Sequence, residues 1–146
     1  MSNYSKGVIS IPEVTGDIVI TVTTEGQAVN LFDSSTASYN ARIRGNGELQ
    51  AANGILVTAP IDVRNLNTLT VSGITEVKSS GYGYYACMCA YTDSSGTTIS
   101  GSIATYTTEQ YTFDVSSASY VRLGLVLKDN VAISTADTAN LTIYGS

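Results

Sequence analysis

The chain has 146 residues, a net charge of −5 at pH 7, and charged residues at only 13% of its positions. This length is enough for one domain that buries roughly two thirds of its unfolded surface. The composition is polar but weakly charged, unlike that of a disordered segment. The seven basic residues are scattered, which argues against nucleic acid as a partner because phosphate binding needs a basic stripe.

Histidine and tryptophan are both absent. Histidine is the commonest general base and metal ligand, so its absence argues against an enzyme. Tryptophan is the strongest stacking surface for a sugar, and tyrosine is left to do that work. No apolar run approaches the ~20 residues of a membrane helix, and the N-terminus lacks the features of a secretory signal. We therefore predict no catalytic residues, no cofactor and no membrane partner.

The N-terminal segment predicts a β-hairpin. Residues 7–23, GVISIPEVTGDIVITVT, form two alternating stretches joined by a turn around Pro12 to Gly16. The segment TEGQAVN then breaks the pattern, so we divide the chain into an attachment segment, 1–26, and a β-sandwich, 27–146. A lone hairpin is marginal in water. It must pack on this domain, on a copy of itself or on a neighbouring protein.

Apolar and polar residues alternate in almost every later segment, as in half-buried strands. The clearest face comprises Val121, Leu123, Leu125 and Leu127. Turn sequences separate the segments: RGNGE, AANG, RNLN, TDSSG and LKDN. The stretch FDSSTASYN is compatible with a single helical turn capped by Asp33 or Ser34. Many short strands with frequent turns predict an all-β antiparallel sandwich or barrel.

Two cysteines lie one residue apart in GYGYYACMCAYTDSSG, residues 81–96. In a strand one face carries Tyr85, Cys87, Cys89 and Tyr91, and the other carries Tyr84, Ala86, Met88 and Ala90. A disulfide between Cys87 and Cys89 would be badly aimed, and a zinc site needs further Cys or His ligands that the chain lacks. Buried free cysteine behaves as a small hydrophobe. The stretch therefore predicts a strand with both thiols packed in a core.

The tyrosines allow three interpretations. They can line a shallow groove in which rings stack on sugars, with Arg122 or Asp93 bonding the hydroxyls. They can form ordinary cross-strand pairs, or they can belong to a subunit interface. The candidate ligand-binding residues are Tyr82, Tyr84, Tyr106, Tyr120, Arg122 and Asp93, with Tyr111 as a further member of such a groove.

The carboxylates predict no metal site. Asp93 and Asp129 lie in turn sequences and are most simply turn residues. A structural Ca²⁺ needs many oxygen ligands, and the chain has no D-x-D-x-D-G loop to supply them. The acids fall mostly at strand ends and turns, so nothing in the spacing pairs two of them as in a glycosidase.

The segment SKGVISIPEVTGDIVITV, residues 5–22, looks like a hairpin that closes a small β module. It resembles such hairpins in structural proteins of phages that infect Gram-positive bacteria. The remainder resembles a phage-tail module with a carbohydrate-binding-like jelly roll. The matching positions are Asn30 to Asp33, Val57 to Val63, Tyr91 to Gly96 (with Thr92 inserted before Asp93) and Tyr120 to Arg122. The likeness extends from Ser5 to Tyr144 and brings no settled set of binding residues.

The resemblance implies a jelly-roll β-sandwich in a virion protein of a tail fibre, baseplate or head decoration. We expect a surface protein of the particle, assembled in the bacterial cytoplasm, that binds other virion proteins through its hairpin and forms a homo-oligomer, with a trimer favoured. Two functions stay open: a glycan-binding adhesin for cell-surface polysaccharide, and a decoration or joining protein with only protein–protein contacts. The chain starts with Met and ends soon after its last predicted strand, which fits a complete small protein or an excised module.

Overall fold

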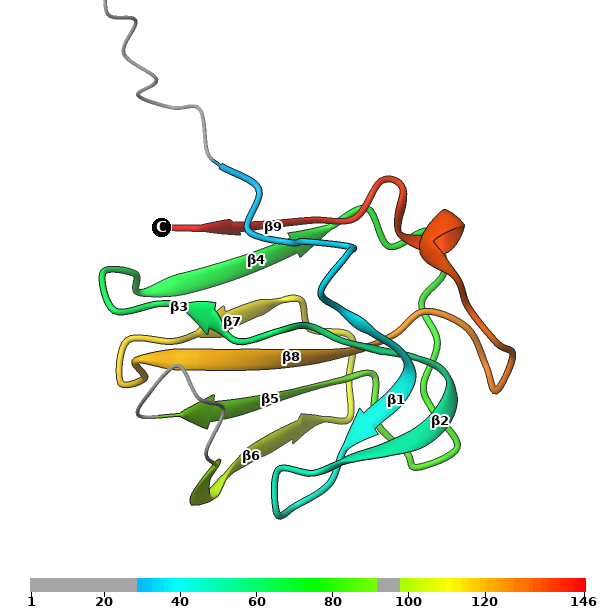
Figure 1. Ribbon diagram of the computed structural model, residues 1–146, viewed down its shortest axis with the longest axis horizontal. Coiled ribbons are helices and arrows are strands. Elements are labelled where there is room, and N and C mark those ends of the chain that lie inside the picture. The colour runs from blue at the N-terminus through cyan, green and yellow to red at the C-terminus, as the bar shows by residue number, and fades with distance from the viewer. Residues whose placement is uncertain (1–28, 92–97) are drawn as a thin grey trace, which may run out of the picture.

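The structure, a computed structural model, describes residues 29–91 and 98–146. The predicted hairpin, the boundary after residue 26 and Asp93 lie outside the described residues. Within them the chain forms two antiparallel sheets (Figure 1). The strands are β1 (Ser38–Ile43), β2 (Leu49–Val57), β3 (Ile61–Asp62), β4 (Thr68–Ser72), β5 (Ala86–Tyr91), β6 (Thr98–Tyr106), β7 (Thr112–Asp114), β8 (Tyr120–Val126) and β9 (Thr142–Gly145). The prediction of an antiparallel all-β protein is confirmed.

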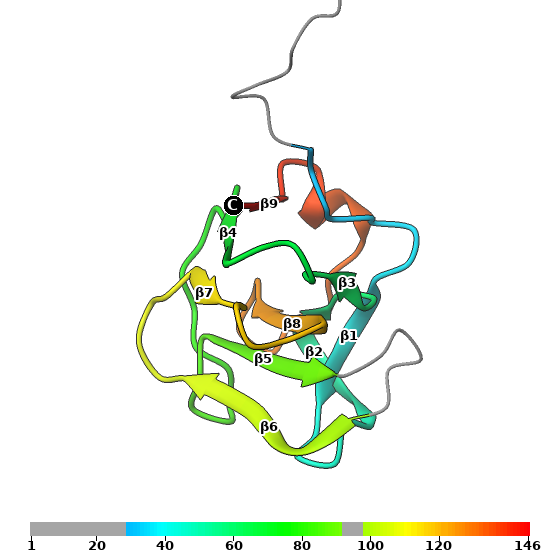
Figure 2. The same ribbon diagram turned by 90° about the vertical axis from the view of Figure 1, so that its left-hand side faces the viewer.

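The larger sheet has the order β1-β2-β8-β5-β6, and the short strand β3 also pairs with β8. The smaller sheet has the order β7-β4-β9. Strand β8 is central because it pairs with β5 along one side and with β2 and β3 along the other. The 90° view separates the smaller sheet from β5, β6 and β8 (Figure 2).

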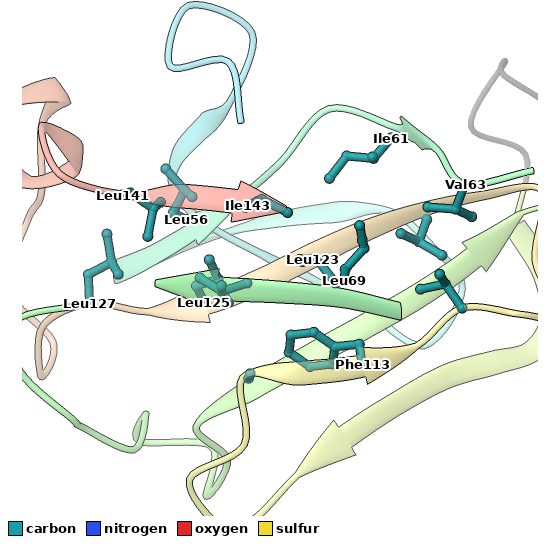
Figure 3. Close-up of a cluster of buried hydrophobic side chains, with 14 of the residues drawn as sticks. Leu56, Ile61, Val63, Leu69, Phe113, Leu123, Leu125, Leu127, Leu141 and Ile143 are labelled. Atoms are coloured by element: carbon teal, nitrogen blue, oxygen red, sulfur yellow. The ribbon is translucent and has the colours of Figure 1, made fainter. Parts of the chain in front are cut away.

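The main core lies between the two sheets. Leu123 and Leu125 of β8 are fully buried there with Leu69 of β4, Phe113 of β7 and Ile143 of β9. The close-up shows these side chains gathered between the strands (Figure 3). The face predicted from the alternation of residues 121–127 is therefore the face that packs against the smaller sheet.

A second core lies on the other face of the larger sheet. Cys89 and Tyr91 of β5 are buried there with Val57 of β2 and Ala41 and Ile43 of β1. In both ribbon views β1 and β2 bend together, and the turn that joins them lies near β6 (Figures 1 and 2). The β1–β2 hairpin thus covers part of the sheet to which it belongs, and the sheet buries side chains on both faces.

Gly54 lies inside β2, so the prediction of a turn at AANG is wrong. Its φ of 87° is a left-handed conformation, which glycine adopts without strain. Its N–H donates to Asn40 Oδ1 at 3.3 Å. Its carbonyl accepts the N–H groups of Leu127 and Lys128 at 2.8 and 3.2 Å. These partners satisfy the backbone where the strand bends, and the strand continues instead of reversing.

A turn precedes β1 and a short 3-10 helix precedes β9. In the stretch FDSSTASYN, Ser35 donates to Asp33 Oδ1 through both its N–H (2.9 Å) and its hydroxyl (2.7 Å). A turn that begins at Asp33 therefore lies at the predicted position, but these residues do not form a helical turn. A 3-10 helix, η1, covers Thr135–Thr138, where no helical pattern is visible in the sequence.

We expect Gly54→Ala to lower the free energy of unfolding by about 2–4 kcal/mol, because alanine is strained at this φ and its Cβ would collide with the Lys128 carbonyl. Urea denaturation measures the change. The matched control is Gly45→Ala, since a Cβ at that exposed turn glycine meets no atom within 4 Å. Equal free energies of unfolding for the two variants would contradict the left-handed bend at Gly54.

Candidate functional site

A tight turn before β5 presents Tyr82 to solvent. The N–H of Gly83 donates to the Ser80 carbonyl at 2.9 Å, and the N–H of Ser80 donates to the Tyr84 carbonyl at 2.8 Å. The Ser80 hydroxyl also accepts the N–H of Tyr82 at 3.1 Å. Gly83 adopts a φ of 84°, which closes the turn. The backbone around Tyr82 is therefore fixed by its own hydrogen bonds.

Two neighbours orient the Tyr82 ring. The Arg42 guanidinium carbon lies 4.0 Å from the ring centroid, which is a close cation–π contact. The Tyr84 ring lies 6.5 Å away, centroid to centroid, at an interplanar angle of 25°. Tyr82 nevertheless remains 54% exposed. The result is a fixed aromatic surface that is open to a ligand.

A hollow of about 260 Å³ adjoins this ring. Polar side chains on its wall come from Asn53, Ser80, Asp129 and Asn130, and apolar ones from Ala52 and Ile55. The 127–130 loop reaches the hollow because Gly54 accepts the N–H groups of Leu127 and Lys128. The bend in β2 therefore brings Asn53 and Asp129 to the same hollow as Tyr82.

Below Tyr82, the Tyr84 side chain is buried beside Ile55, Cys87 and Val126. Burial raises the pKa of Tyr84, and Arg42 opposes that shift in part. Its hydroxyl has no hydrogen-bond partner, and neither does the buried Nε of Arg42. Arg42 Nη2 donates to Gln50 Oε1 at 2.6 Å, so the guanidinium stays over Tyr82.

The other candidate residues lie apart from Tyr82 and Tyr84. Tyr106 contacts Phe113 edge-on, with ring centroids 5.2 Å apart, at the core between the sheets. Tyr120 is half-buried under the Arg64 guanidinium, 5.2 Å from its ring centroid. The structure brings together Tyr82 and Tyr84 and does not bring Tyr106 to them. Asp93 lies outside the described residues.

Arg122 lies beside Tyr91 on the outer face of the larger sheet. It opposes Cys89 across the β5–β8 ladder, and its buried Nε has no partner. Burial, together with the neighbouring Cys89, raises the pKa of Tyr91 to about 12 against the opposing effect of Arg122. Tyr91 itself has no exposed surface. This pair contributes to the second core and offers no exposed aromatic surface.

One predicted face is wrong. Tyr84 does not share a face with Ala86, because it packs with Cys87 whereas Ala86 belongs to the core between the sheets. The reason is that β5 begins only at Ala86, after the turn at Gly83. Strand alternation therefore does not extend back to Tyr84.

Arg42 and Asn53 are the members of this site that the sequence did not indicate. Both lie on the β1–β2 hairpin, about 40 and 30 positions before Tyr82 in the chain, and no motif links them to it. Asp129 was recognised only as a turn residue. The sequence signal that was available is the pair of glycines around Tyr82, which marked a turn with an aromatic residue at its tip.

Two further hollows lie elsewhere on the described surface. One of about 370 Å³ is lined by residues that include Leu31, Asp33, Pro60 and Asp62. The other, of about 140 Å³, lies beside Glu76, Lys128 and Asp137. Neither has an aromatic side chain on its wall. The hollow beside Tyr82 is smaller than the one of about 370 Å³. It is better suited to binding a sugar by stacking, because it has an aromatic ring on its wall.

Both cysteines are free and buried, as predicted for packing in a core. Cys87 opposes Gly124 across the ladder, and a Cβ at Gly124 would collide with its Sγ. Burial raises the pKa of Cys87 to about 11. Reactive thiols have lowered pKa values and are accessible to solvent. The Cys87 thiol is buried and its pKa is raised, so we expect it to be unreactive in the folded protein.

No protein-family model, curated protein or solved structure matches the chain. In the described ranges, 29–91 and 98–146, no cluster of three or more His, Cys, Asp and Glu residues is placed to bind a metal ion. No helix within those ranges is long and apolar enough to span a membrane. The geometry around Tyr82 is therefore the structural basis for a proposed binding site.

We expect the native protein to react with DTNB at pH 8 at least about 100-fold more slowly than the protein in urea, because both thiols are buried and must be exposed by local opening. Absorbance at 412 nm follows the reaction. The unfolded chain provides the fast reference rate. Rapid reaction of a native thiol would contradict the burial of that cysteine on the outer face of the larger sheet.

Proposed function

We propose that the chain is a structural and adhesion protein on the surface of a phage particle, where many copies bind host or environmental glycans weakly. The observation that carries the binding role is the fixed, 54% exposed Tyr82 ring beside a hollow with polar walls. Tyrosine rings stack on the C–H faces of sugars, and amide and carboxylate groups bond their hydroxyls. The phage assignment is based on the motifs in residues 5–22 and 30–122.

Each side chain has a distinct role in this proposal. Tyr82 stacks on the sugar ring, and Arg42 and Tyr84 hold it in that orientation. The amides of Asn53 and Asn130 donate to and accept from sugar hydroxyls, and Asp129 accepts from them. No described residue pair is given an acid–base role, so the proposed activity is binding without catalysis.

We further propose a jelly-roll connectivity for residues 27–146 and an attachment role for residues 1–26. Two antiparallel sheets packed on one core are compatible with a jelly roll. The proposed attachment is to other virion proteins, after assembly in the bacterial cytoplasm. Free, buried cysteines suit a reducing compartment.

We expect Tyr82→Ala to reduce binding to glycans at least about tenfold, since it removes the stacking surface. The measurement is a glycan array probed with the full chain displayed at high density on fluorescent beads. Tyr82→Phe keeps the ring and is expected to bind within about threefold of the wild type.

Leu49→Ala is the matched surface control, because Leu49 is an exposed apolar residue of β2 that does not line the hollow. Melting temperatures verify that all variants are folded. A wild type that binds no glycan would refute the adhesion role. Binding that Tyr82→Ala leaves unchanged would exclude Tyr82 as the site.

The alternative function is a decoration or joining protein, and the sheet edges favour it. In the described part of the chain, β6 pairs only with β5 and β7 pairs only with β4, whereas Asn30 and Leu31 bond the outer edge of β9 at Ile143. Open edges pair readily with strands of another chain. In this alternative the partners are other virion proteins or further copies, and no glycan is bound.

For either function we expect a homo-oligomer, with a trimer favoured because phage appendages are symmetric. Light scattering on the full chain measures the mass, and a trimer has three times the 15.3 kDa of one chain. A concentration series separates a stable trimer from weak association. A monomer at all concentrations would contradict self-assembly.

A further inference from the structure

Arg42 carries a charge that no described acid balances. The ion pairs in the described part of the chain join Arg64 to Asp62 and Lys128 to Asp137. Arg42 is half-buried, and its side-chain hydrogen bond is to the neutral amide of Gln50. Its Nε is buried without a partner. A partly desolvated cation of this kind gains from an anion that the protein does not supply.

The position of this charge is next to the open aromatic ring. The guanidinium lies 4.0 Å from the Tyr82 centroid, and Tyr82 lines the hollow. A guanidinium has five N–H donors and binds carboxylate or phosphate in a forked geometry. Since Gln50 accepts from Nη2, Nη1 can donate to a ligand group beside the ring.

We propose that the ligand of this site is an anionic glycan, whose carboxylate or phosphate pairs with Arg42 while its sugar ring stacks on Tyr82. This inference depends on the proposed glycan-binding function and specifies its substrate class. Uncharged glycans make the same stacking contact but leave the Arg42 charge unpaired.

Asp129 fixes the orientation of such a ligand. Its carboxylate lies on the wall of the hollow with Asn53 and Asn130, where it repels a second acid and accepts from hydroxyls. The acid group must therefore point to Arg42 and the hydroxyls to the hollow. The protein's net charge of −5 disfavours acidic polymers at long range, so any preference for them must come from a local contact.

The test compares acidic glycans with neutral glycans of the same sugar backbone. One pair is oligogalacturonate and its methyl ester, and the other is phosphorylated dextran and dextran. Binding of each to the full chain is measured by biolayer interferometry with immobilised sugar. We expect the wild type to bind at least one acidic member at least about tenfold more tightly than its neutral counterpart. Arg42→Gln is expected to remove that preference.

Arg122→Gln is the matched control, since Arg122 is also half-buried with an unbonded Nε but has no contact with Tyr82. It is expected to keep the acidic preference. Arg42→Lys retains the positive charge and is expected to keep part of the preference for acidic glycans. Melting temperatures and the fluorescence of Tyr82, compared with Tyr82→Phe, verify that the site is intact.

The outcomes separate the two proposals. Equal binding of charged and neutral members by the wild type, abolished by Tyr82→Ala, overturns the anionic ligand and leaves the glycan site standing. The anionic ligand is also overturned if Arg122→Gln loses the preference for acidic glycans and Arg42→Gln keeps it. No binding to any of the four polymers, with no binding on the glycan array, overturns both. Preference within only one pair restricts the recognised ligand to the carboxylate on galacturonan or to the phosphate on dextran.

Discussion

The side-chain amide of Asn40 is the contact on which the rest of the described structure depends. Its Oδ1 accepts the N–H groups of Ile133 (2.8 Å) and Gly54 (3.3 Å), and its Nδ2 donates to the Ile133 carbonyl at 3.0 Å. Asn40 adopts a φ of 58° at the bulge where the β1–β2 register shifts. Asparagine is among the few residues that tolerate this conformation. One side chain thus joins β1, β2 and the loop after β8.

That junction determines how the larger sheet is used. Because β1 and β2 bend at Asn40 and Gly54, their far ends cover the outer face of β5, and the thiols become buried. A flat sheet would leave Cys89 and Tyr91 exposed to water on the face opposite the main core. The same bend places Asn53 beside the 127–130 loop and so forms the hollow next to Tyr82. The second core and the candidate site therefore have one structural cause.

The sequence was informative where local rules decide the outcome. Alternation in residues 121–127 predicted the buried face of β8, because a strand packed on one side must obey a period of two. The prediction of a turn failed at Gly54. Glycine and asparagine usually mark a turn, but here they permit a bend whose hydrogen bonds come from distant residues. The contact between Arg42 and Tyr82 could not be predicted from the sequence either, because it depends on the bend in β2 and not on the spacing of the two residues. The fold class was thus predictable, and most of the candidate site was not.

The dimensions of the site agree with a surface that acts in many copies. At about 260 Å³ the hollow lies just below the ~300–1,000 Å³ of typical small-molecule pockets, and its ring is half open to water. Such a site encloses little of a polymer, so a single contact is weak. Fixed orientation of Tyr82 reduces the entropy cost of each contact, and in the proposed oligomer symmetric repetition would multiply the contacts by raising the effective concentration. A rigid, shallow site on an oligomer is therefore a physically consistent way to bind a long glycan reversibly.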